Sequence, residues 1–254
     1  MNSKDQIYSL DCGGKEVTFS FVHPETHKLF GTYLNKTENS HADIAMSPEI
    51  IRKRDWIVME EVDAPYLEFY ASMVETGNYL LAYNRALFHS VSFIWNNLAW
   101  LVTAPSGTGK TTQLKHWGRL CGKAVSVING DKSVLECRDD GTVYVHSAPW
   151  TGKEGIGFPG KKAKLGGIIL LEQGGTNEIH RIYPEDSVLP LFYEFISYPQ
   201  SVAQLESQGK ILDCMLKSVP VWKLINLGDR ASAELTIKTL RDYLRNKHDE
   251  SEIS

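Results

Sequence analysis

The chain has 254 residues, enough for one large or two modest domains with a sizeable core. Hydrophobic residues make up 42% of it and charged residues 23%, which is typical of a soluble globular protein. The net charge of −4 argues against general nucleic-acid binding, because such binding requires a basic face.

Targeting segments, membrane spans and cysteines bear on the cellular location of a protein. The first residues lead into no apolar segment, and no apolar run approaches the ~20 residues of a membrane span. We therefore expect no signal peptide and no membrane partner. The four cysteines form no Cys-x-x-Cys pair, which predicts reduced thiols, a cytoplasmic protein and no zinc site. They are Cys12, Cys121, Cys137 and Cys214.

Residues 1–85 differ from the rest and are interpreted as a small β-rich N-terminal module. Residues 17–22 alternate like a half-buried strand, and residues 56–59 are a short apolar run. Residues 35–47 are polar and turn-rich. No catalytic constellation is recognisable in this module.

From residue 86 to residue 248 the pattern predicts an α/β nucleotide-binding domain. Apolar runs at 91–94 and 98–103 flank Asn96-Asn97, which indicates a strand, a turn and a second strand. Residues 110–121 are predicted to be a helix that stops at Gly122. Further strands are predicted at 124–128, 133–137, 142–146, 167–172, 178–182 and 219–225. Further helices are predicted at about 185–195, 199–217 and 231–246, with a frayed tail from residue 248.

Residues 104–112, Ala-Pro-Ser-Gly-Thr-Gly-Lys-Thr-Thr, match the phosphate-loop pattern G-x-x-x-x-G-K-[ST], with Ala104 in the first glycine position. Glycines let backbone N–H groups turn toward an anion, the lysine reaches the β- and γ-phosphates, and the next hydroxyl holds Mg²⁺. The following helix points its positive end at the phosphates. The alternative is a turn that only looks like the motif. We expect ATP to be bound by Ser106, Gly107, Thr108, Gly109, Lys110, Thr111 and Thr112, with Mg²⁺ on Thr111.

Asp131 follows the strand predicted at 124–128, within Asn-Gly-Asp-Lys. It would lie on the rim of the sheet where ligands bind. A carboxylate there can hold Mg²⁺ or accept a proton from an incoming hydroxyl. By spacing alone, a turn aspartate after Gly130 is an equal alternative.

Four segments together resemble the HPr kinase/phosphorylase family and its shorter relatives, which share a P-loop fold with phosphoenolpyruvate carboxykinases. Residues 88–91 are similar to the family's His-Gly-Val, 105–112 to its phosphate loop, and 129–132 to its Asp-Asp segment. Residues 148–153 and 163–173 look like the relatives found near peptide-modifying gene clusters. The resemblance covers about residues 86–245, and the N-terminal module matches nothing specific.

The resemblance implies that Asp131 is the catalytic base, a Mg²⁺ ligand or both, and that His89 lies beside it and orients or tunes it. For His89 alone, a strand histidine facing core or solvent is the alternative. Gly130 replaces the first aspartate of the family's pair. With one aspartate left, the resemblance does not assign metal binding and proton acceptance to separate residues. Relatives in the family form hexamers, so a homo-oligomer is one option.

Residues 147–167 are predicted to be a long glycine-rich loop that acts as a lid or binding loop. Between residues 152 and 165, four lysines stand against the single Glu154, a balance of +3. Lys153 is the candidate for a phosphate or acceptor contact, because residues 149–152 would hold it stiffly. Lys161 and Lys162 are more simply solvated.

The leading hypothesis is an ATP- and Mg²⁺-dependent kinase that phosphorylates a hydroxyl, serine above all, of a protein or peptide. Its catalytic residues would be Asp131, His89 and Lys110. The alternatives are a small-molecule kinase, a carboxykinase, which needs a longer chain, and a non-catalytic ATP-sensing module, which Gly130 keeps open. The sequence names neither the acceptor nor whether reverse phosphorolysis occurs.

Overall fold

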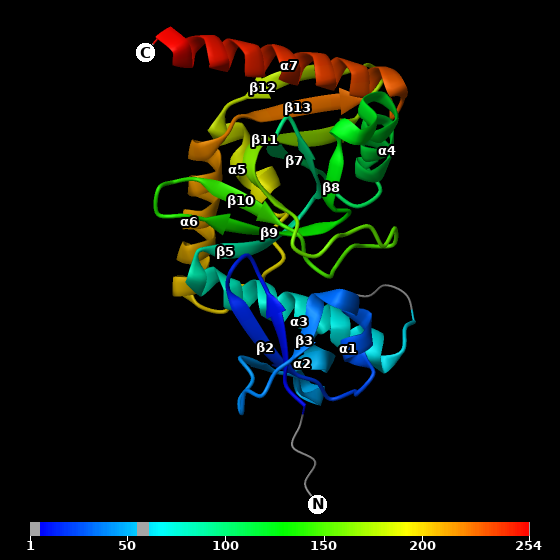
Figure 1. Cartoon of the computed structure of the whole chain (residues 1–254), viewed down its shortest axis with the longest axis vertical. Coiled ribbons are helices and arrows are strands. Elements are labelled where there is room, and N and C mark those ends of the chain that lie inside the picture. The colour runs from blue at the N-terminus through cyan, green and yellow to red at the C-terminus, as the bar shows by residue number, and fades with distance from the viewer. Residues whose placement is uncertain (1–5, 55–60, 254) are drawn as a thin grey trace, which may run out of the picture.

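The computed structural model describes residues 6–54 and 61–253, and it shows a mixed α/β protein with two sheets (Figure 1). The apolar run at 56–59 lies outside these residues. Among the described residues, the smaller sheet has four strands and the larger sheet has nine. None of the described helices combines the length and the apolar character needed to cross a membrane.

The N-terminal module contains more helix than the sequence predicted. Its sheet has the order β3-β1-β2-β4, with β1 at Tyr8–Asp11, β2 at Glu16–Ser20, β3 at Leu34–Lys36 and β4 at Ile44–Ala45. Its helices are α1 (Thr26–Leu29), α2 (Pro48–Lys53) and α3 (Ala64–Leu80). Helix α3 begins where the Asp63 side chain accepts a hydrogen bond from the Tyr66 N–H, and Phe69, Met73 and Leu80 lie on its buried face.

The larger sheet has the order β5-β9-β10-β11-β7-β6-β8, and β13 and β12 extend it from β11. The strands that approach the phosphate loop are β5 (Arg85–His89), β6 (Val91–Trp95), β7 (Leu98–Thr103) and β8 (Ser126–Asn129). Asn96 and Asn97 form the predicted turn with φ values of 50° and 60°. Helix α4 spans Lys110–Cys121 and ends at Gly122, as the sequence predicted. Strands β9 (Lys132–Cys137) and β10 (Val143–His146) form the predicted hairpin.

Strand β11 (Lys162–Gln173) begins five residues before the predicted start at 167, so the glycine-rich loop ends at residue 161. The sequence prediction was wrong because β11 uses two partners in turn. Residues 162–164 pair antiparallel with β10, and the rest pairs parallel with β7 and β13 after an irregularity between Leu165 and Gly167. A Cβ on Gly167 would lie 2.5 Å from the Trp222 ring, so this close approach requires glycine.

The last elements are β12 (Glu178–Ile182), α5 (Pro184–Phe192), α6 (Val202–Ser218), β13 (Val221–Asn226) and α7 (Arg230–Ile253). Three predicted helix ends are wrong. Helix α6 begins at residue 202, not at about 199. Helix α5 stops at residue 192, not at 195, and α7 continues to residue 253, so residues 248–253 are helical. The extension fits the sequence, because residues 247–253 contain neither glycine nor proline.

Helices cover both faces of the large sheet. On β7, Leu101 packs in the cluster with residues of α5 and α6, while Trp100 and Val102 pack with residues of α4 and α7. Successive strand residues point to opposite faces, so each face receives its own core. A third core joins the N-terminal module to the sheet, because Phe30 and Phe69 share a cluster with Leu87, Val134 and Trp150.

Candidate active site

Residues 104–109, which the sequence predicts to be a phosphate loop and which keep that name below, join the end of β7 to the start of α4. Gly107 and Gly109 have φ values of 82° and 109°, a region that glycine adopts without steric cost. The hydroxyl of Thr108 donates a hydrogen bond to the Pro105 carbonyl at 2.8 Å, which closes a tight turn. Ala104 occupies the usual first glycine position and does not have a positive φ. A side chain with a Cβ is therefore tolerated there.

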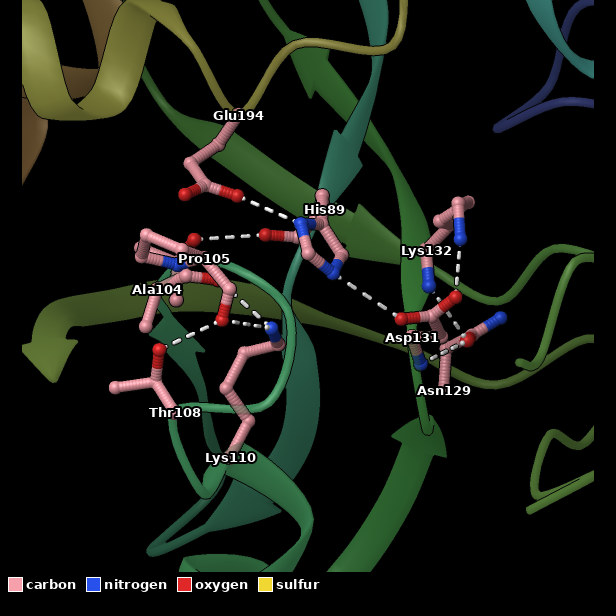
Figure 2. Close-up of polar contacts among 10 residues, drawn as sticks. His89, Ala104, Pro105, Thr108, Lys110, Asn129, Asp131, Lys132 and Glu194 are labelled. Atoms are coloured by element: carbon pink, nitrogen blue, oxygen red, sulfur yellow. Dashed lines mark hydrogen bonds and ion pairs between the residues drawn. The ribbon is translucent and has the colours of Figure 1, made fainter. Parts of the chain in front are cut away.

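Lys110 begins α4, and its ammonium group lies inside the loop. Nζ donates hydrogen bonds to the carbonyl oxygens of Ala104 at 2.7 Å and Pro105 at 3.3 Å (Figure 2). Burial lowers the pKa of Lys110, and the charges of Glu194 and Asp131 oppose this effect in part. The cation therefore lies within electrostatic reach of both carboxylates.

Asp131 is held at the end of β8 by the side chain of Asn129, which the sequence analysis did not select. Asn129 is fully buried, and its Oδ1 accepts hydrogen bonds from the N–H groups of Asp131 and Lys132 at 2.9 and 3.0 Å. The Asp131 carbonyl also accepts a hydrogen bond from the Ser90 N–H at 2.8 Å. Two neighbouring segments therefore fix the backbone that carries this carboxylate.

His89 joins two carboxylates from distant parts of the chain. Its Nε2 lies 3.3 Å from Oδ1 of Asp131, and its Nδ1 lies 2.7 Å from Oε2 of Glu194 (Figure 2). Sequence reasoning missed Glu194, which follows α5 and is only 7% exposed. No motif marks this glutamate, since it meets His89 only through the tertiary fold. Lys132 was also missed, and its ammonium group forms an ion pair with Oδ2 of Asp131.

These contacts favour charged side chains. Burial raises the pKa of Asp131, but the hydrogen bond from His89 and the charge of Lys132 outweigh it and hold the pKa at about 2. Burial lowers the pKa of His89, but the hydrogen bonds to Asp131 and Glu194 outweigh it and raise that pKa above its ordinary value. A protonated imidazole can donate to both carboxylates at once. The site therefore presents an ionised Asp131 at neutral pH.

The other predicted binding residues lie in the phosphate loop, in the first turn of α4 and directly after Gly152. Thr111 is half-buried in the first turn of α4, while Ser106, Gly107 and Thr112 are exposed. Lys153 is exposed and directly follows Gly152, whose Cβ position is 2.8 Å from Cβ of Asp131. The chain segment that carries Lys153 thus passes beside the carboxylate.

The glycine-rich loop at residues 147–161 is seated against β8. The Gly130 N–H donates a hydrogen bond to the Ile156 carbonyl at 2.7 Å, and Asn129 and Gly157 form a β-bridge. A Cβ on Gly130 would lie only 3.0 Å from the Ile156 oxygen and 3.3 Å from that of Thr151. A larger side chain at residue 130 would therefore require the loop to shift by a few tenths of an ångström, so the seated loop favours glycine there.

A cavity of about 760 Å³ opens beside the phosphate loop. Its wall on that side is formed by Ala104, Pro105 and Thr108, and Glu194 reaches it from the end of α5. The rest of the lining comes from the end of β11, from β12 and β13, and from α5. Its volume is within the roughly 300–1,000 Å³ typical of small-molecule sites.

Comparisons with known proteins give likenesses in structure alone. No family model matches the chain, and no curated protein matches its sequence. The structure of the HPr(Ser) kinase/phosphatase from Coxiella burnetii is similar at a TM-score of 0.37 and 12% identity, over 65% of this chain and 94% of that one. At this level of similarity, function has to be inferred from the site itself.

Proposed function

We propose that this protein is an ATP- and Mg²⁺-dependent phosphotransferase that phosphorylates a serine hydroxyl of a protein or peptide. One observation carries the proposal. The buried ammonium of Lys110, inside a glycine loop at a helix N-terminus, lies within electrostatic reach of an ionised Asp131 that is held by His89 and Lys132. Phosphoryl transfer needs such a phosphate cradle together with a carboxylate that receives the hydroxyl.

The residues would divide the chemistry as follows. Lys110 and the N–H groups of the phosphate loop bind the phosphates and stabilise negative charge during transfer. The serine oxygen forms a bond to the γ-phosphorus as the bond to the bridging oxygen breaks and ADP leaves. Asp131 accepts the serine proton, and His89 keeps the carboxylate oriented, with Glu194 holding the imidazole from its other side.

Mg²⁺ fits this donor set. No cluster of three or more His, Cys, Asp or Glu side chains suited to a metal occurs among the described residues. In nucleotide enzymes, however, Mg²⁺ is bound through one or two protein ligands, phosphate oxygens and water. The Thr111 hydroxyl and the ionised Asp131 would hold it, and its charge would offset that of the phosphates.

The test is label transfer from ATP carrying a radioactive γ-phosphate, with serine peptides as acceptors and Mg²⁺ present. We expect acid-stable label that is recovered as phosphoserine. Lys110→Ala should abolish transfer and weaken ATP binding measured by calorimetry, whereas Lys123→Ala, at an exposed lysine after the same helix, should behave like the parent. ATP binding without transfer to any acceptor would favour the ATP-sensing alternative.

A further inference from the structure

In-line phosphoryl transfer places the donor and the acceptor on opposite sides of the transferred phosphorus. If the proposed function holds, the site must be open on two flanks. One flank must take the nucleoside end of ATP, and the other must bring the acceptor hydroxyl to Asp131. The cavities of the protein can be assigned to these flanks from their lining residues.

The 760 Å³ cavity lies on the donor flank. It borders the first half of the phosphate loop at Ala104, Pro105 and Thr108, and extends along β11 toward Lys223 of β13. Its lining includes neither Asp131 nor Lys132 nor any residue of the loop at 147–161. It is large enough for a nucleoside and leaves the Asp131 side to the acceptor.

A second pocket, of about 140 Å³, lies on the Asp131 flank. Outside the N-terminal module, it is lined by Lys132 and residues 149–152. Two of these contact the proposed base, because Lys132 pairs with Asp131 and the Cβ position of Gly152 is 2.8 Å from Cβ of Asp131. The remaining lining comes from α1 and α3 of the N-terminal module, which lie below the loop in Figure 1. These residues are Leu29, Tyr66, Phe69 and Tyr70.

Aromatic residues from two parts of the chain line the pocket. Trp150 and Phe69 are only 2% and 7% exposed, and a hydrogen bond from Trp150 Nε1 to the Phe69 carbonyl at 3.1 Å holds them as a rigid base. The ring surface that a ligand can touch comes from Tyr66 and Tyr70. Leu29 and Tyr66 stand at the mouth, with 39% and 37% of their surface exposed. Lys132 and Thr151 also line the pocket. Aromatic rings pack well on such ring surfaces, and a ring face also attracts a nearby cation.

We propose that this pocket binds an aromatic side chain of the peptide acceptor at a fixed distance from the serine that is phosphorylated. The volume is below the range of whole small-molecule sites, which suits a single side chain. The N-terminal module thereby takes part in acceptor selection, since α1 and α3 supply four of the nine lining residues.

The experiment uses the full chain, γ-labelled ATP and a library of peptides that contain one serine and one varied neighbouring position at a time. We expect kcat/KM to rise about tenfold when Phe, Tyr or Trp occupies one particular position, mainly through a lower KM. Leu29→Trp, which fills the mouth of the pocket, should remove this preference. Tyr66→Ala should weaken it. Leu205→Trp, at a 50% exposed leucine of α6 outside the pocket, is the matched control and should retain it.

Two results separate the possible failures. Transfer to serine peptides without an aromatic preference, or with a preference that Leu29→Trp leaves intact, would overturn the role of the pocket and leave the kinase assignment standing. A parent protein that binds no ATP and labels no peptide would overturn the proposed function, and the acceptor pocket with it.

Discussion

The arrangement of Glu194, His89 and Asp131 is a line of carboxylate, imidazole and carboxylate at the edge of the large sheet. Each oxygen–nitrogen contact is strongest when the imidazole is protonated. Glu194 is more deeply buried than Asp131 and lies farther from Lys132, so we assign it a positioning role and assign proton acceptance to Asp131.

The first prediction concerns Glu194. Glu194→Gln keeps the size of the side chain but removes its charge, so the protonated imidazole loses part of its stabilisation. We expect the pKa of His89, followed by NMR, to fall below its value in the parent. The free energy of unfolding should fall by about 1–2 kcal/mol. Glu172→Gln, at an exposed glutamate paired with Lys223, should change neither quantity near His89. An unchanged His89 pKa would show that Glu194 does not hold the imidazole.

The second prediction is a pH dependence of stability. The raised pKa of His89 stabilises the fold fully below pH 6.5, and this contribution is lost as the pH rises through the higher folded-state value. The pKa of Asp131, lowered from 3.8 to about 2, stabilises the fold above pH 3.8, and this contribution is lost as the pH falls toward 2. The stability difference between the parent and His89→Gln should therefore be largest between about pH 4 and 6.5.

Urea unfolding of both proteins from pH 4 to pH 9 measures that difference. It should shrink as the pH rises above 6.5. A difference that stays constant or grows over this range would mean that His89 is not held in its protonated form.

At the scale of elements, the phosphate loop depends on a helix that begins directly after a glycine of positive φ. A side chain at Gly109 would be strained, because L residues avoid φ near its value of 109°. Gly118 lies in the middle of the same helix, with ordinary φ and open space around its Cβ position. Gly109 therefore has a backbone conformation that favours glycine, whereas Gly118 does not.

The third prediction compares these glycines. Gly109→Ala should destabilise the protein by about 1–2 kcal/mol and weaken ATP binding, because the N–H groups of the loop are turned away from the anion. Gly118→Ala should stabilise the helix by about 0.5–1 kcal/mol and leave ATP binding unchanged. Thermal unfolding and calorimetry check both. Equal effects of the two substitutions would contradict the required geometry at Gly109.

Elements whose signals are local could be predicted from the sequence. The turn at Asn96-Asn97, the start of α4 and its end at Gly122 each depend on residues within a few positions. The start of strand β11 could not be predicted. Residues 162–164 are held in the strand by pairing with β10, and they are exposed or half-buried, so they show no apolar run. The early end of α5 likewise depends on a distant contact, since the Glu194 carbonyl accepts a hydrogen bond from the His89 N–H at 2.8 Å.

In the candidate site, too, residues with a local sequence signal could be predicted and residues placed by tertiary contacts could not. Lys110 and Asp131 could be selected because a motif and a strand end mark them. Glu194, Lys132 and Asn129 could not, because their partners are set by the folded chain and not by sequence spacing. The fit of Gly130 against the loop is also a tertiary property, visible only once the Ile156 carbonyl is placed.

At the scale of the whole molecule, the N-terminal module shares a core with the large sheet. Trp150, from the glycine-rich loop, packs against Phe30 of the module with ring centroids 5.8 Å apart and against Phe69 of α3 with centroids 6.1 Å apart. Because one buried cluster contains residues of both parts, neither part keeps its full core without the other. We therefore expect the two parts to unfold together.

The fourth prediction tests this coupling. Trp150→Ala should lower the free energy of unfolding by about 3–5 kcal/mol, as expected for a buried tryptophan. The parent should show a single transition in scanning calorimetry. Trp150→Phe, which keeps an aromatic ring but loses the hydrogen bond to Phe69, should cost less. Two separate transitions in the parent would show that the module is an independent folding unit.

The most direct test of the central claim is the turnover of Asp131→Asn, measured as γ-phosphate transfer at saturating ATP with ATP affinity determined in parallel. Asparagine keeps the size of the side chain but removes the charge that receives the proton and helps to hold Mg²⁺. We expect turnover to fall by about 10²-fold or more, the loss typical of a missing general base. ATP affinity should change far less if Asp131 acts chiefly as the base, and should fall with turnover if it acts chiefly on Mg²⁺. Transfer at the parental rate would contradict the account, because the carboxylate that carries the chemistry would then lie elsewhere.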